Sequence, residues 1–216
     1  MLKSIFQIAF LLMFVSGCTT TVEPYDYTAL KANAPRSILV IPPMNNSVEV
    51  TAPYSFLSTI TAPLAESGYY VYPVSVIDTF LKENGLPTPA EMNSIPLEKI
   101  DEIIGADAVL YVSIDDWGQK YNVLSSVTVV KGHLKLVSVK TGILLWDAPI
   151  FAQYNPNANN GGGGLVGALV GAVVSQIAGE VTDNTPLVSR MANNMAINGK
   201  DRGLLYGPYK VVKEGE

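Results

Sequence analysis

The chain has 216 residues, of which 48% are hydrophobic and 15% are charged, and its formal net charge is −5. This length suits one domain with a sizeable core, and an acidic chain without a basic stripe is a poor nucleic-acid binder. Its single cysteine excludes an internal disulfide, so the fold depends on packing alone.

The N-terminus is organised like a bacterial lipoprotein signal peptide. Lys3 precedes an apolar run over residues 5–15, which is too short to span a bilayer. The small residues Ser16 and Gly17 then lead into Cys18, an order that resembles the lipobox of lipoprotein precursors. The resemblance implies cleavage before Cys18 and attachment of diacylglycerol and a further acyl chain such as palmitate, which together hold a protein on a membrane. An ordinary secretory signal is the alternative.

The residues after the cysteine indicate location and a connecting segment. Residue 19 is a threonine and not the aspartate that favours inner-membrane retention, so the resemblance to lipoproteins implies the outer membrane. The domain would then lie in the periplasm, with cell-surface exposure as the other option. Residues 18–35 are polar, contain two prolines and have no sustained hydrophobic period, which predicts a lipidated tether.

The first half of the remaining chain predicts a parallel α/β arrangement. Apolar strands are expected at 37–41, 69–74 and 108–114, helices at 53–67, 76–84 and 97–104, and a Pro-rich loop at 86–95. Pro63 is expected to kink or split the first helix, while Ser75 and Asp78 predict a capping box for the second. Alternation of strands and helices is typical of a parallel sheet.

The second half predicts antiparallel pairing. Residues 127–140 alternate apolar and polar side chains, and the Thr141–Gly142 turn leads into a partner strand at 143–151. A last helix follows from Thr185, and residues 200–216 are expected to wrap around the domain in extended form. The predicted fold is therefore a single α/β domain over 36–216, with a mixed sheet, a parallel βαβ first half, an antiparallel hairpin in the second half and flanking helices.

A glycine-rich helical insertion is expected at 161–179. Small residues recur there at every fourth position, which on a helix forms a flat ridge that another backbone can approach closely. The ridge consists of Gly163, Gly167, Gly171, Ser175 and Gly179. It predicts oligomerisation or membrane contact, with packing inside the domain or a mobile loop as the alternatives.

Candidate catalytic and binding residues are few. His133 is the only histidine and has no cysteine or carboxylate cluster beside it in the sequence, so no metal site and no cofactor are expected. Asp115 and Asp116 follow a predicted strand, where they fit a strand-ending turn better than an acid pair. Four aromatic residues near strand ends predict either a ligand groove or core packing; they are Trp117, Tyr121, Trp146 and Tyr154.

Several segments resemble the α/β domain that curli-secretion lipoproteins share with the N-terminal domain of the Tol-system propeller protein. They are 38–43, 68–73, 105–112 and 140–146. With the lipobox and residues 206–209, nearly the whole chain resembles a family of bacterial outer-membrane lipoproteins of unknown function, of the neisserial surface-antigen type. The resemblance implies an α/β fold and membership of an envelope assembly, and it supplies no catalytic residue. A pore of the curli type is not expected, because 161–179 lacks the alternation of a barrel strand.

These observations predict a lipid-anchored, non-enzymatic interaction module in a cell-envelope assembly or secretion complex. Its expected partners are the membrane, other envelope proteins and further copies of itself. The alternative is a ligand-binding lipoprotein that holds a peptide, glycan or lipid for a transporter, and a more distant one is a hydrolase that uses Asp115 or Asp116.

Overall fold

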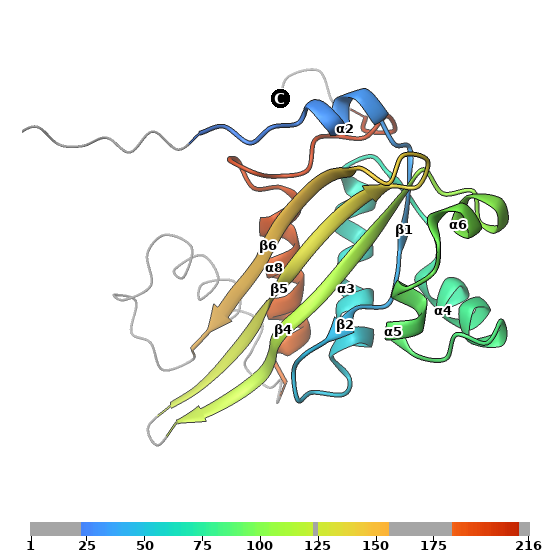
Figure 1. Ribbon diagram of the computed structural model, residues 1–216. Coiled ribbons are helices and arrows are strands. Elements are labelled where there is room, and N and C mark those ends of the chain that lie inside the picture. The colour runs from blue at the N-terminus through green and yellow to red at the C-terminus, as the bar shows by residue number, and fades with distance from the viewer. Residues whose placement is uncertain (1–22, 123–124, 156–182, 212–216) are drawn as a thin grey trace, which may run out of the picture.

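A mixed six-stranded sheet forms the centre of the molecule in a computed structural model, which describes residues 23–122, 125–155 and 183–211 (Figure 1). The strand order is β3-β1-β4-β5-β6, and β2 pairs with β4 beyond the end of β1. The strands are β1 (Ser37–Val40), β2 (Met44–Asn45), β3 (Tyr70–Val71), β4 (Ala108–Asn122), β5 (Ser125–Ser138) and β6 (Leu144–Tyr154). β1 pairs in parallel with β3 and β4, and β2 pairs in parallel with β4. The pairs β4–β5 and β5–β6 are antiparallel, which confirms the predicted mixed sheet.

The helices lie on both sides of this sheet. They are α2 (Thr28–Asn33), α3 (Ala52–Glu66), α4 (Val74–Glu83), α5 (Pro89–Asn93), α6 (Leu97–Ile103) and α8 (Thr185–Ile197). Figure 1 shows α3 and α8 against one face, while α4, α5 and α6 gather around β1 on the other. The described part of the chain contains no helix that is both long enough and apolar enough to cross a membrane.

The β1 strand is buried on both faces because the two helical layers meet across it. Ile38 and Val40 belong to the larger core with α3 and α8, whereas Leu39 and Ile41 pack with α4, α5 and α6. All four side chains are at most 1% exposed. This explains the continuous apolar sequence of the strand, as expected for a central parallel strand.

The β4–β5 hairpin is longer than predicted. The sequence predicts that the first strand ends before Asp115 and Asp116, but β4 continues through both residues to Asn122. The pairing register shifts between Ile114 and Asp116, so a β-bulge absorbs the aspartate pair. Pairing with β5 therefore outweighs the low strand propensity of aspartate.

Other local predictions need correction. Pro63 lies three residues before the end of α3 at Glu66 and does not split the helix, because its missing N–H removes only one backbone hydrogen bond near the C-terminal end. The capping box occurs at Thr88 and Glu91, where it starts α5 inside the predicted loop, and α4 begins after Pro73 without a side-chain cap.

Candidate interaction site

The N-terminal segment is attached to the domain by three side chains, which we call the N-terminal clamp: Tyr25, Asp147 and Arg202. The Tyr25 hydroxyl donates to Asp147 Oδ1 at 2.8 Å and accepts from the Asp147 backbone N–H at 3.0 Å. Arg202 donates to Asp147 Oδ2 at 2.5 Å and stacks over the Tyr25 ring at 4.6 Å from its centroid. The clamp thus joins the N-terminal segment, β6 and the C-terminal segment.

Neighbouring contacts extend the clamp on both sides. The Tyr27 hydroxyl donates to Gly203 O at 2.5 Å, and Trp146 Nε1 donates to Arg202 O at 2.9 Å. Leu30 of α2 is 3% exposed within the larger core. Residues 24–35, which the sequence assigns to a tether, are therefore packed on the domain.

The electrostatics of the clamp favour its charged form. Burial by itself would raise the pKa of Asp147, but hydrogen bonds from Tyr25 and Arg202 and the charge of Arg202 hold this pKa below its usual value. Burial and the bond to Asp147 raise the pKa of the Tyr25 hydroxyl. The carboxylate is thus ionised and the phenol neutral at physiological pH, which is the state that makes these hydrogen bonds.

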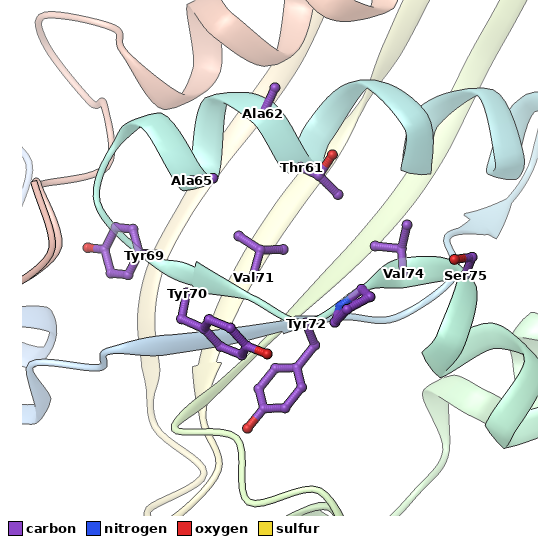
Figure 2. Close-up of a pocket in the computed structure, with 10 residues that line it drawn as sticks. Thr61, Ala62, Ala65, Tyr69, Tyr70, Val71, Tyr72, Val74 and Ser75 are labelled. Carbon is purple, nitrogen blue, oxygen red and sulfur yellow. The ribbon is translucent and has the colours of Figure 1, made fainter.

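A groove of about 560 Å³ lies beside β3, at the opposite edge of the sheet from β6. It is lined by Thr61, Ala62 and Ala65 of α3 and by residues 69–75. Figure 2 shows Val71 directed towards α3, while Tyr70 and Tyr72 point to the other side of the strand. Their rings meet edge to face, with centroids 5.1 Å apart.

One residue of β3, Val71, makes no backbone hydrogen bond to β1. Tyr70 N and Tyr72 N donate to carbonyls of Arg36 and Ile38, so the peptide groups of Val71 face away from β1. An exposed strand edge of this kind accepts an extended peptide as an additional strand. Val71 thus offers one N–H and one C=O beside the groove for such pairing.

The candidate catalytic or metal-binding residues from the sequence lie on the face of the β4–β5 hairpin that is turned away from α3 and α8. His133 Nε2 is 3.5 Å from Asp115 Oδ2, and their side chains are 56% and 32% exposed. Lys120 Nζ is 2.6 Å from Asp116 Oδ1. The two aspartates thus have different partners, His133 for Asp115 and Lys120 for Asp116, and do not share a partner as an acid pair would.

Neither arrangement is a metal centre. Within the residues that the structure describes, no three histidine, cysteine or acidic side chains gather closely enough to hold an ion. The aspartates are also partly exposed on the hairpin and lie outside the groove beside β3.

Of the two alternatives for the four aromatic residues, core packing holds for three and a shared groove is not formed. Trp117, Trp146 and Tyr154 are 3%, 0% and 7% exposed and belong to the larger core, whereas Tyr121 is 77% exposed near the end of the hairpin. The groove beside β3 is instead lined in part by Tyr70 and Tyr72, which the sequence indicates only as part of a predicted strand. Cys18, the signal peptide at 1–17 and the small-residue ridge at Gly163, Gly167, Gly171, Ser175 and Gly179 lie outside the described residues, and their roles stay predictions.

Comparisons with known proteins identify relatives over most of the chain. Residues 25–209 match the model of a family described as "Putative lipoprotein GNA1162-like". The chain is 40% identical over 202 residues to "Putative lipoprotein NMB1124/NMB1162" of Neisseria meningitidis serogroup B, with 93% of each chain covered. It also resembles the crystal structure of lipoprotein GNA1162 from Neisseria meningitidis, with 41% identity, a TM-score of 0.56 and coverage of 67% of this chain and 99% of that one.

Proposed function

Because the chain belongs to the GNA1162-like lipoprotein family, we propose that it is a lipid-anchored outer-membrane lipoprotein whose α/β domain is a non-enzymatic interaction module in an envelope assembly. In this proposal Cys18 carries the lipid, and residues 1–17 are removed as the signal peptide. The domain binds other envelope proteins and further copies of itself.

The N-terminal clamp is the observation that carries this proposal. Only six residues lie between Cys18 and Tyr25, so the distance between these two residues is at most about 25 Å when the chain is extended. From Tyr25 onward the chain is fixed to β6 and to the C-terminal segment. Such a short attachment holds a domain at a defined height above a membrane, which suits a component of an assembly better than a carrier that exchanges ligand between distant partners.

Radiolabelled palmitate and envelope fractionation test the anchor. The wild-type protein is expected to incorporate palmitate and to stay with the outer membrane, whereas Cys18→Ser loses the label and leaves that fraction. Tyr25→Phe serves as a matched control, because it alters the clamp and leaves the lipidation signal intact. An unmodified Cys18 thiol in the mature wild-type protein would refute the anchor.

Chemical cross-linking in intact envelopes tests the interaction module. We expect discrete cross-linked species that include a homo-oligomer, and we expect deletion of residues 161–179 to remove that oligomer. The double variant Asp115→Ala/Asp116→Ala is the control for a hydrolase and should leave both the cross-links and the cellular phenotype unchanged. A monomer alone in the wild-type envelope would contradict the proposal.

The groove beside β3 favours a second candidate, a ligand-binding lipoprotein that serves a transporter. Its test is a thermal-shift screen with peptides, glycans and lipids, since a ligand that binds only the folded state raises the melting temperature. Ala62→Trp would fill the groove next to Ala65 and should abolish any such shift. Absence of a shift with every ligand class would leave the interaction module as the better account.

A further inference from the structure

The N-terminal clamp and both ends of the described chain lie at the same end of the molecule. The clamp joins Tyr25 to Arg202, and Tyr27 binds Gly203, so the N-terminal segment lies directly beside the C-terminal segment. Figure 1 shows α2 and the red C-terminal segment at the same end of the sheet, opposite the tip of the β4–β5 hairpin. Any lipid on Cys18 must therefore emerge at this end.

This end presents three exposed residues with apolar surface, which we call the anchor-end patch. Tyr206, Tyr209 and Val211 are 65%, 59% and 82% exposed. They follow Gly203 by three to eight residues, so the two tyrosines lie within about 20 Å of the clamp even if the chain between them is fully extended. The two tyrosines are thus no farther from the clamp than the lipid-bearing cysteine can be.

The backbone that carries the patch is firmly held on the domain. The buried Tyr69 hydroxyl donates to Leu205 O at 2.7 Å, and its burial raises the pKa of Tyr69 to about 12. Gly207 N donates to Ser67 O at 2.8 Å, and Tyr209 N donates to Gly68 O at 3.0 Å. The exposed rings are therefore presented from a fixed backbone.

The chemistry of the patch fits a lipid surface. Tyrosine rings favour the boundary between lipid headgroups and acyl chains, because one end of the side chain is apolar and the other is polar. Lys210 Nζ lies 4.7 Å from the Tyr206 ring centroid and donates to the backbone carbonyl of Glu66 at 3.0 Å, so its ammonium is held against the domain. Exposed Lys31 and Lys200 each have an exposed aspartate close in sequence, Asp26 and Asp201, so the proposal assigns the contact to the rings and not to net charge.

We propose that the anchor-end patch rests on the lipid surface to which Cys18 is attached, with Tyr206 and Tyr209 at headgroup level. This inference depends on the proposed lipid anchor. It sets the orientation of the domain: β4, a strand of 15 residues and about 50 Å at the usual rise, carries the hairpin tip away from the membrane. Partners of the hairpin then bind on the side that faces away from the anchoring bilayer.

Fluorescence quenching in vesicles tests this orientation. The mature lipidated protein carries a thiol-reactive bimane at Tyr209→Cys or, as the matched control, at Tyr121→Cys, since both tyrosines are exposed and lie at opposite ends. The vesicles contain phosphatidylethanolamine and phosphatidylglycerol with a headgroup spin label. We expect quenching at position 209 to exceed that at position 121 by about twofold or more.

The outcomes separate the two proposals. Vesicle flotation with equal quenching at both positions, or stronger quenching at position 121, would overturn the orientation and leave the anchor intact. Failure of the wild-type protein to float with vesicles would instead refute the anchor, and the orientation with it. If a neighbouring protein covers the patch in cells, cross-linkers at position 209 will capture that protein and not lipid, which also counts against the inference.

Discussion

Gly68 allows the C-terminal segment to approach the end of α3. Its φ is +90°, and a Cβ built there would lie 2.3 Å from Lys210 N and 2.7 Å from Lys210 Cα. We expect Gly68→Ala to lower the free energy of unfolding by about 1–3 kcal/mol, because both the backbone conformation and the backbone contact oppose a side chain. Urea denaturation measures the loss.

Gly85→Ala is the matched control for this prediction. Gly85 has a φ of +85°, but a Cβ there meets nothing within 4 Å. Gly85→Ala therefore measures the conformational cost alone. The difference in free energy of unfolding between the two variants then reports the contact with Lys210. Equal losses in both variants would show that the C-terminal segment does not pack on Gly68 in solution.

The clamp makes stability depend on pH through Asp147. Its pKa is lowered in the folded state, so its ionised form contributes stability above the unfolded pKa of about 4, and that contribution is lost as pH falls through the folded value. We expect the wild type to lose more stability than Asp147→Asn between pH 7 and pH 3. Chemical denaturation at both pH values measures this, and the same change in an exposed carboxylate, Asp101→Asn, should keep the wild-type dependence.

A small polar cluster joins α3 to α8 within the core. The Thr59 hydroxyl donates to Phe56 O at 2.9 Å and lies 2.7 Å from Ser189 Oγ, and it accepts from Asn193 Nδ2 at 3.0 Å. Among the described residues, Asn193 Oδ1 is a buried side-chain atom without a hydrogen-bond partner. The hydroxyl is therefore the centre of the cluster, and the asparagine is incompletely satisfied.

This imbalance predicts opposite effects for two similar substitutions. Thr59→Val should lower the free energy of unfolding by about 1–3 kcal/mol, because it leaves buried groups of Ser189 and Asn193 without a partner. Asn193→Leu should be neutral or stabilising by up to about 1 kcal/mol, since it removes an unsatisfied group and suits a helix. Thermal unfolding compares them, and a large loss in Asn193→Leu would indicate that a buried water satisfies Oδ1.

Elements with an apolar or periodic pattern could be predicted from sequence. The apolar run at 37–41 and the 3.6-residue pattern of α3 identify their elements because burial on a sheet or helix face leaves a repeated signature. The strand predicted at 69–74 contains β3, although only two of its residues are assigned to the strand, whereas the two-residue strand β2 leaves no such signature. The aspartate pair in β4 was misread because a local turn preference cannot report the pairing that a partner strand imposes.

The candidate site was harder to predict than the fold for the same reason. Tyr25, Asp147 and Arg202 come together from three distant parts of the chain, and none of them has a motif around it. The tryptophans attract attention as groove residues, yet large aromatic side chains usually supply core area, as Trp146 does here. Only Cys18 is signalled strongly by its local sequence, because the lipobox that it resembles is a short linear motif.

At the scale of the whole molecule, the proposed lipid on Cys18 would be joined to the clamp by a short connection, which would fix the height and orientation of the domain above the membrane. Insertion of 20 Gly/Ser residues between Val22 and Glu23 would raise the extended reach by about 70 Å and would leave every described contact in place. We therefore expect the melting temperature to stay unchanged while cross-links to membrane-proximal partners weaken severalfold, because effective concentration falls as a linker lengthens.

Quantitative cross-linking in intact envelopes measures that effect, with the same 20 residues inserted after Val211 as the control for added length alone. The control is expected to keep the wild-type cross-links, since it does not alter the connection to Cys18. Wild-type cross-linking by the N-terminal insertion variant would mean that its partners follow the domain wherever it moves. The clamp would then serve stability alone, and the position of the domain above the membrane would have no part in assembly.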